Sequence, residues 1–131
     1  MIDLAKISTR APEDLDKKET KKKTKEITED IGKLAEKMKA EGKHSLLIVF
    51  QGIDSSGKDG ATEHVFSATS PSFVKVKGFT KPTEEEFAHD FMWRVTKEAP
   101  AKGMIQVFVR SHYEDVLIQR VHNWIDEVRV T

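Results

Sequence analysis

The sequence of 131 residues contains no cysteine, so disulfide bonds, a thiolate nucleophile and a thiolate metal site are all excluded. Its longest fully apolar run, Leu46–Phe50, is far too short to span a bilayer, and its start lacks the apolar core of a signal peptide. The formal net charge is zero, so overall charge does not indicate a nucleic-acid partner. These absences predict a soluble, cytoplasmic protein with neither a membrane nor a nucleic acid as its partner.

The charges that are present are unevenly distributed. Six lysines crowd one stretch near the N-terminus: Lys17, Lys18, Lys21, Lys22, Lys23 and Lys25. This stretch is interpreted either as a solvated helix face or as a docking surface for a polyanion.

A helical pattern covers the same region. Apolar residues recur there at spacings of four, three and four: Ile27, Ile31, Leu34 and Met38. That spacing predicts one apolar stripe on a helix over about 16–40. Gly42 follows as a stop signal, because glycine readily adopts the left-handed conformation that ends many helices.

Beyond Gly42, strand and helix patterns alternate. Three strand candidates are each followed by a helix candidate: 45–50 and 58–68, 73–79 and 83–99, 104–109 and 113–128. Ser45–Phe50 is mainly a continuous apolar run, which predicts a strand buried on both faces. The alternation predicts an α/β fold, a parallel sheet with helices on both faces. We therefore divide the chain into an N-terminal arm with the long helix, 1–42, and an α/β core, 43–131.

The helix candidate over 83–99 has a defined start and a defined face. Thr83 and Glu86 have the spacing of a capping box, in which a hydroxyl and a carboxylate accept hydrogen bonds from the first backbone N–H groups. Phe87, Phe91 and Val95 follow at helical spacing, so they predict a buried stripe along one helix.

The most informative motif lies between the first strand candidate and its helix. Gly52, Gly57 and Lys58 match the first seven positions of G-x-x-x-x-G-K-[ST], in the strand-to-helix context that this motif requires. Glycines let backbone N–H groups turn inward as a nest for phosphate oxygens, and the helix dipole and the lysine add positive charge. The motif predicts a P-loop with seven phosphate-binding residues: Gly52, Ser55, Ser56, Gly57, Lys58, Asp59 and Gly60.

Two acids accompany this loop. Asp59 stands where serine or threonine would ligate Mg²⁺, and an acid in the first turn of a helix also stabilises the helix dipole, which is the favoured interpretation. Asp54 lies inside the loop, where a carboxylate is costly unless a metal or a proton compensates it. We expect Asp54 to face Mg²⁺ or the attacking phosphate, with a turn-stabilising role as the alternative.

Four strings in this order and spacing resemble the family 2 polyphosphate kinases: QGIDSSGKDG at 51–60, GFTKPTEEE at 78–86, HDFMWR at 89–94 and FVRSHYEDVLIQRVH at 108–122. The resemblance runs from about Ile27 to Trp124. It implies a P-loop kinase-like sheet and Mg²⁺-dependent phosphoryl transfer between inorganic polyphosphate and a nucleoside mono- or diphosphate, such as AMP or ADP. An adenine or guanine nucleotide and a homo-oligomer are the partners that it implies.

The resemblance also implies roles for single residues. Asp54 would hold Mg²⁺ or activate the acceptor phosphate, Lys58 would contact the transferred phosphoryl group, and Arg110 would stabilise phosphate charge. Three residues are expected on the nucleotide side: Lys81, Asp90 and Arg94. From the residues alone, a surface ion pair stays open for Arg110 and Arg94, and a solvated loop position stays open for Lys81.

Two departures from the family pattern qualify this expectation. Val109 stands where the family usually has an acid or an asparagine beside the metal. Family members also continue past the position of Thr131, with further strands and a basic lid, so we expect a truncated fold with an incomplete sheet. A catalytically impaired module that binds phosphate or nucleotide without turnover is therefore the alternative function.

Overall fold

The computed structural model describes residues 7, 8, 10–119, 121 and 122. A long helix comes first, and strands and shorter helices then alternate: α1 (Lys17–Glu41), β1 (Leu46–Phe50), α2 (Lys58–Val65), β2 (Val74–Gly78), α3 (Glu84–Ala88), α4 (Trp93–Thr96), β3 (Ile105–Val109) and the π-helix η2 (Glu114–Gln119). The remainder of the helix expected over 113–128 lies largely outside the described residues. No helix within the described residues is both long and apolar enough to cross a membrane.

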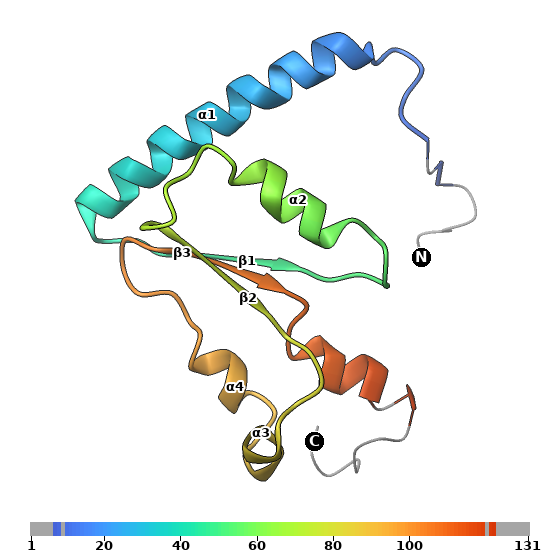
Figure 1. The fold of residues 1–131 in the computed structure, drawn as a ribbon, viewed down its shortest axis with the longest axis vertical. Helices are drawn as coiled ribbons and strands as arrows, with labels where there is room; N and C mark the ends of the chain where they lie inside the picture. The colour runs from blue at the N-terminus through green and yellow to red at the C-terminus, as the bar shows by residue number, and fades with distance from the viewer. Residues whose placement is uncertain (1–6, 9, 120, 123–131) are drawn as a thin grey trace.

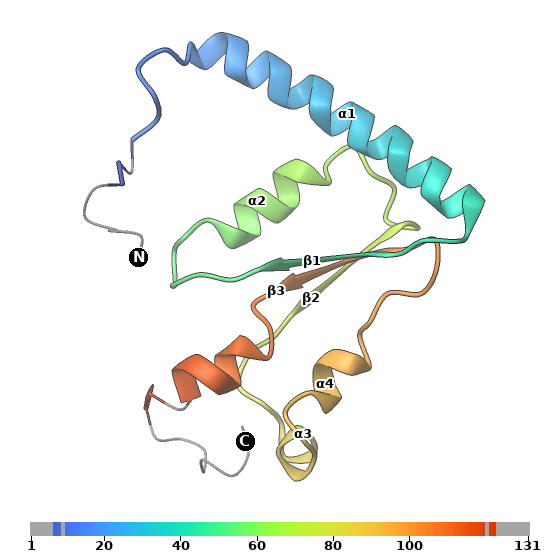
Figure 2. The ribbon, with the colours of Figure 1, turned by 180° about the vertical axis from the view of Figure 1, so that it is seen from behind.

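The three strands form one parallel sheet in the order β1–β3–β2. Val107 at the centre of β3 pairs with Ile48 of β1 and with Val76 of β2. Helices α1 and α2 lie on one face of the sheet, and α3, α4 and η2 lie on the other (Figures 1 and 2). The predicted α/β fold, with a parallel sheet, helices on both faces and a long N-terminal helix, is therefore confirmed.

Strand β3 supplies the core on both sides of the sheet. All five of its residues are buried, because β3 has a neighbouring strand on each side and helices above and below. Ile105 and Val107 pack with Ala35 of α1, whereas Phe108 packs on the opposite face with Phe79 and Val95. Side chains of a strand alternate between faces, so this one strand joins the two layers of helices.

Strand β1 lies at the edge of the sheet, so the prediction that it is buried on both faces is wrong. The side chains of Leu46, Leu47 and Val49 are 45%, 44% and 40% exposed. A continuous apolar run identifies a strand, but it does not determine which strand becomes central. Here the last strand in the sequence inserts between the first two, and β1 and β2 become edges.

The apolar stripe predicted for α1 is only partly buried. Ile27 and Leu34 are 50% and 62% exposed, and the buried positions of the helix are the smaller Thr28, Gly32 and Ala35. A side chain at position 32 would bring its Cβ to 2.6 Å from the carbonyl oxygen of Ala68. Because α1 packs closely on the segment after α2, the buried face of α1 is the one with small side chains and not the most apolar one.

The ends of α1 follow sequence signals. The Asp16 carboxylate accepts a hydrogen bond of 2.8 Å from the backbone N–H of Glu19 and caps the start. Gly42, with φ of 63°, ends the helix and donates its N–H to the carbonyl oxygen of Met38 at 3.0 Å. The predicted stop at Gly42 is confirmed.

The single helix predicted over 83–99 is instead two short helices. Its capping box is confirmed, since Glu86 donates its N–H to the Thr83 hydroxyl and the Glu86 carboxylate accepts from the Thr83 N–H. However, α3 ends at Ala88, and the Asp90 carboxylate accepts a hydrogen bond of 2.8 Å from the N–H of Met92. A side chain that bonds nearby backbone competes with the helix, which explains the break.

Candidate active site

The loop between β1 and α2 is folded tightly upon itself. Ser55 and Gly57 have φ of 62° and 86°, and the Ser56 N–H donates to the Ile53 carbonyl at 3.2 Å. A Cβ at Gly52 would lie 2.8 Å from the Ser56 hydroxyl, so any side chain there would force Ser56 to move. The structure therefore contains the strand, the glycine-rich loop and the helix that the motif predicts, in that order.

The Lys58 side chain turns back into this loop. Its ammonium donates to the carbonyl oxygens of Gly52 and Ile53 at 2.9 and 2.8 Å, and to the Ser56 hydroxyl at 3.4 Å. The residue is buried, with 9% exposure, and a buried charge must be satisfied by such contacts. The loop therefore encloses the ammonium group of Lys58. Contact between this ammonium and a phosphoryl group remains a prediction.

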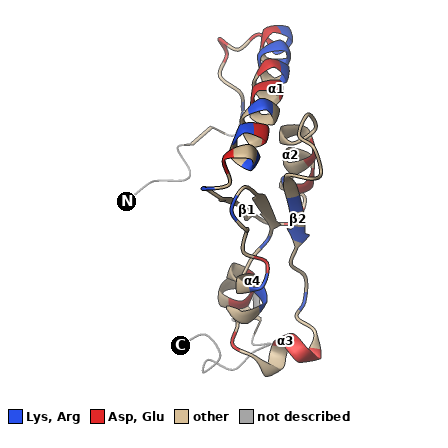
Figure 3. Ribbon diagram, turned by 90° about the vertical axis from the view of Figure 1, so that its left-hand side faces the viewer, with Lys and Arg blue, Asp and Glu red and all other residues tan. Residues whose placement is uncertain are grey.

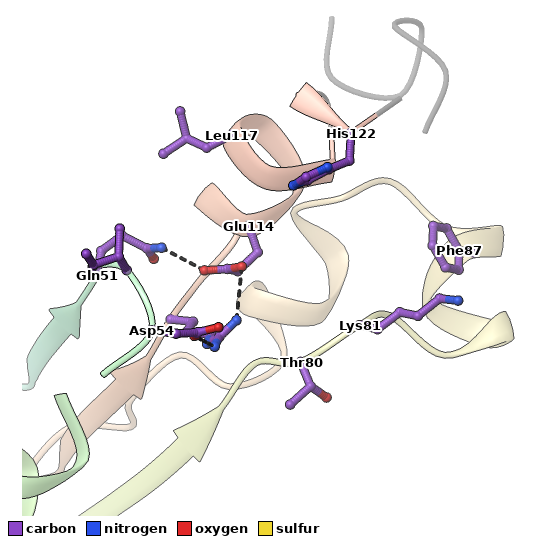
Figure 4. A pocket seen from close by; sticks show the side chains of 11 residues that line it. Gln51, Asp54, Thr80, Lys81, Phe87, Glu114, Leu117 and His122 are labelled. Carbon is purple, nitrogen blue, oxygen red and sulfur yellow. Dashed lines mark hydrogen bonds and ion pairs between the residues drawn. The ribbon is translucent and has the colours of Figure 1, made fainter. Parts of the chain in front are cut away.

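Arg110 joins the ends of the two neighbouring strands β1 and β3. Its φ of 66° is in the left-handed region, which costs energy for a residue other than glycine, and its N–H donates to the Phe50 carbonyl at 2.9 Å. Its guanidinium is paired with the carboxylates of Asp54 and Glu114 (Figure 4). Glu114 in turn accepts a hydrogen bond of 2.8 Å from the Gln51 amide. A network of ion pairs and hydrogen bonds, called the polar network below, therefore connects the loop after β1 to η2.

A cavity of about 970 Å³ opens beside this polar network, at the carboxyl edge of the sheet. Charged groups from three segments line it: Asp54, Lys81, Arg110 and Glu114. In Figure 4, Asp54 and Glu114 lie near each other, and Lys81 lies across the cavity from them. The volume is within the range of small-molecule sites, which is about 300–1,000 Å³.

The structure brings together only some of the predicted site residues. Asp54, Lys81 and Arg110 line the cavity with Gly52, whereas Lys58 is enclosed in the loop. The remaining two residues expected on the nucleotide side, Asp90 and Arg94, are not among its lining residues. Their roles toward a nucleotide stay predictions, and the structure gives both of them contacts within the protein.

Arg94 is buried on the face of the sheet opposite to α2. Its guanidinium donates to the Thr80 carbonyl at 2.8 Å and to the Asp115 carboxylate at 3.0 Å, and it also lies 5.4 Å from the centroid of the Phe79 ring. The side chains of Arg94 and Asp115 are 3% and 0% exposed. Thr80 lines the cavity, so Arg94 helps to fix the position of one lining residue through its backbone carbonyl.

Sequence reasoning missed three polar residues of this region: Gln51, Glu114 and Asp115. Two of them had a usable signal, because Gln51 directly precedes Gly52 and Glu114 lies only four residues after Arg110. Asp115 had none, because its partner Arg94 is 21 residues away along the chain.

The donor set can be tested for its fit to Mg²⁺. No three histidine, aspartate or glutamate side chains of the described residues gather closely enough to hold a metal ion. However, Mg²⁺ commonly takes one or two carboxylates and completes its shell with waters and substrate phosphates. Asp54 is such a carboxylate, 83% exposed and beside the cavity. The residues present therefore fit a magnesium ion that arrives with a phosphorylated ligand.

The fold and the site together define an α/β protein with a glycine-rich loop at the carboxyl edge of a parallel sheet, the edge at which open α/β sheets bind their ligands. The chain belongs to the polyphosphate kinase 2 family, whose model matches residues 14–131. The resemblance inferred from the four sequence strings is thereby confirmed.

Three relatives illustrate the similarity. An AMP/ADP-polyphosphate phosphotransferase of Meiothermus ruber is 48% identical over 97 residues, which are 74% of this chain and 36% of that protein. An ADP-polyphosphate phosphotransferase of Rhodopseudomonas palustris is 44% identical over 94 residues, 72% of this chain and 32% of that protein. A crystal structure of polyphosphate kinase 2 from Arthrobacter aurescens has a TM-score of 0.88 and 39% identity, over 97% of this chain and 47% of that one. The chain thus spans about a third of the length of the two curated relatives.

Proposed function

We propose that the chain contributes the phosphate-binding half of a site for Mg²⁺-dependent phosphoryl transfer between inorganic polyphosphate and a nucleoside mono- or diphosphate. One arrangement carries the proposal: beyond the carboxyl ends of the neighbouring strands β1 and β3, the Lys58 ammonium lies inside the glycine-rich loop and the Arg110 guanidinium pairs with Asp54 of the same loop. The names of the relatives support polyphosphate as one substrate and AMP or ADP as the other.

Phosphoryl transfer requires positioning and positive charge on the phosphate oxygens more than it requires covalent chemistry. Backbone N–H groups of the loop and the Lys58 ammonium would bind those oxygens, in place of the carbonyl groups that the ammonium now contacts. The Arg110 guanidinium, now paired with two carboxylates, would share its charge with a phosphate beside them.

Asp54 would hold Mg²⁺ together with oxygens of the bound phosphates. The ion, when bound, would neutralise charge on the transferred group. Lys81 lies across the cavity from Asp54, where its ammonium would attract the nucleotide phosphates.

The test is an assay of the 131-residue chain with polyphosphate, Mg²⁺ and AMP, ADP or GDP, with chromatography to detect nucleotide that has gained a phosphate. Lys58→Ala should lower the rate by about a hundredfold or more, the loss expected when a charge-stabilising donor is removed from an active site. Lys75→Ala on β2 is the matched control, because Lys75 is equally charged but exposed and outside the cavity, and its rate should equal that of the unchanged chain.

One observation favours the second candidate, a module that binds phosphate without turnover. The two candidate cations are already satisfied by groups of the protein, Lys58 by loop carbonyls and Arg110 by two carboxylates. Binding of tripolyphosphate that depends on Lys58, without any transfer, would support this module and reject the enzyme. Absence of both binding and transfer in a folded chain would reject the two candidates together.

A further inference from the structure

The first part of α1, residues 17–27, extends beyond the contacts that hold this helix to the rest of the molecule. All of its residues are exposed, and the first buried position of the helix is Thr28. It contains six lysines and two glutamates, a net charge of +4 in a chain whose formal net charge is zero. Of these six lysines only Lys22 has an ion-pair partner among the described residues, the Glu26 carboxylate at 4.0 Å.

Three of these lysines continue the buried face of α1. Three lysines and three buried residues follow one another at spacings of four, four, three, four and three: Lys17, Lys21, Lys25, Thr28, Gly32 and Ala35. Residues three and four apart share one face of a helix. The three lysines, called the lysine stripe below, therefore point to the side of α1 on which the remainder of the molecule lies.

The lysine stripe lies on the same side of the molecule as the glycine-rich loop. Helix α1 meets the segment after α2 where Gly32 approaches Ala68, and the two helices diverge from that contact (Figures 1 and 2). In both views the start of α1 and the loop between β1 and α2 lie toward the same end. Figure 3 shows α1 with its lysines in blue and its acidic residues in red, and the start of the helix lies far from the sheet.

The stability of the fold does not explain this charge. Lys17 and Lys18 occupy the first turn of α1, where positive side chains oppose the helix dipole. Lys17, Lys21 and Lys25 also repel one another, because like charges four residues apart destabilise a helix. Both effects are relieved when a polyanion lies along the lysine stripe.

We infer that the lysine stripe is a second polyanion-binding surface, which holds a length of inorganic polyphosphate beyond the part bound at the glycine-rich loop. Its ligand is a flexible, linear chain of phosphates, and the contacts are ion pairs between exposed ammonium groups and phosphate oxygens. The choice of polyphosphate rather than a nucleic acid rests on the proposed function and on the placement of the stripe at the same end as the loop. Binding at the stripe requires no turnover.

The test compares two triple variants that remove the same charge. One removes the stripe, Lys17→Gln with Lys21→Gln and Lys25→Gln, and the control removes three exposed lysines elsewhere: Lys37→Gln with Lys75→Gln and Lys102→Gln. Glutamine keeps the helix, because its helix propensity is close to that of lysine. Fluorescently labelled long-chain polyphosphate is titrated at several salt concentrations, and unlabelled tripolyphosphate is titrated separately by calorimetry.

The stripe variant should bind long-chain polyphosphate more weakly, and the slope of log affinity against log salt should fall by about 2, as expected for three lost phosphate contacts. Its affinity for tripolyphosphate should be unchanged, and the control variant should match the unchanged chain. An equal loss in the control, or an unchanged salt slope in the stripe variant, would overturn the inference.

Two further measurements separate this inference from the proposed function. If Lys58→Ala leaves nucleotide phosphorylation undetectable and the stripe-dependent salt slope intact, the surface is supported independently of catalysis. If the stripe variant behaves like the unchanged chain while Lys58→Ala alone loses transfer, the function stands and the surface is rejected. Equally tight, stripe-dependent binding of a single-stranded oligonucleotide of the same charge would also reject polyphosphate as the specific ligand.

Discussion

Arg94 and Arg110 both pair with carboxylates, but their surroundings differ. The Arg94 and Asp115 side chains are 3% and 0% exposed, whereas those of Arg110 and Asp54 are 34% and 83% exposed. Water and salt screen the exposed pair, so it contributes little to stability and remains available to a ligand. The buried pair cannot lose one partner without leaving an uncompensated charge in the core.

Replacement of Arg94 is therefore expected to destabilise the fold. Arg94→Met should lower the free energy of unfolding in urea by about 3–5 kcal/mol, because the Asp115 carboxylate would stay buried without its partner. Lys77→Met is the control, since the Lys77–Glu98 pair of 3.0 Å is exposed by 40% and 36% and contributes about 1 kcal/mol or less. An Arg94→Met chain of normal stability that fails to bind nucleotide would contradict this interpretation and favour the nucleotide-side role.

Val109 stands where the family resemblance leads us to expect an acid or an asparagine beside the metal. It is the last residue of β3, 9% exposed, and on the same face of the sheet as Val107, toward α1 and α2. Val109→Asp would add a carboxylate near the glycine-rich loop. We expect this change to lower the Mg²⁺ concentration that gives half of the maximal transfer rate by about tenfold or more. The measurement is the rate as a function of Mg²⁺ concentration.

The control for this change adds the same charge elsewhere. Val76→Asp on β2 changes a residue that is 56% exposed and outside the cavity, and it should leave the Mg²⁺ dependence unaltered. An unaltered Mg²⁺ dependence in a folded Val109→Asp chain would reject the prediction that an acid at position 109 strengthens Mg²⁺ binding.

At the scale of elements, local patterns predicted which segments are helices and strands, and long-range packing decided the rest. The glycine-rich loop was predictable, because its glycines and lysine lie within seven consecutive residues. The edge position of β1 was not, because only the insertion of β3 between β1 and β2 determines it. The Arg94–Asp115 pair was not predictable for the same reason, since two separate elements must pack before those side chains meet.

The contact between α1 and the segment after α2 makes a specific prediction. Gly32→Ala should lower the free energy of unfolding by about 1 kcal/mol, because overpacking costs about 1–3 kcal/mol and the better helix propensity of alanine recovers about 1 kcal/mol. The clash is with a backbone carbonyl, that of Ala68, which cannot rotate away as a side chain could. Thermal and urea unfolding measure the change.

Gly60→Ala in α2 is the matched substitution, because nothing lies within 4 Å of a Cβ added there. It should keep or raise stability by about 0.5–1 kcal/mol, the gain expected from alanine inside a helix. If Gly32→Ala were as stable as Gly60→Ala, α1 would not be held by the close approach described above.

At the scale of the whole molecule, the two edges of the sheet are protected differently. The β2 edge carries Lys75 and Lys77, and charged residues of this kind discourage pairing with another strand. The β1 edge, with the exposed Leu47 and Val49, has only apolar residues. The homo-oligomer implied by the family resemblance stays a prediction, and we predict β1 as its contact.

The 131-residue chain is therefore expected to associate as its concentration rises, which analytical ultracentrifugation measures. Val49→Lys should shift the chain toward the monomer, because a lysine on the edge strand disfavours its pairing with another chain. Val76→Lys on β2 is the control and should not change the sedimentation of the protein. A chain that is already monomeric at every concentration, or equal effects of the two variants, would reject the β1 contact.

The strand order has one more consequence, for the time at which the protein acquires its shape. Among the described residues, β1 and β2 each pair with β3, which follows both of them in the sequence, so neither strand has this partner until β3 has been made. In a nascent chain α1 and α2 are therefore made before the sheet can form, whereas the parallel sheet waits for β3. Synthesis of β3 is the event that lets the two earlier strands join one sheet, and η2 then completes the lining of the cavity.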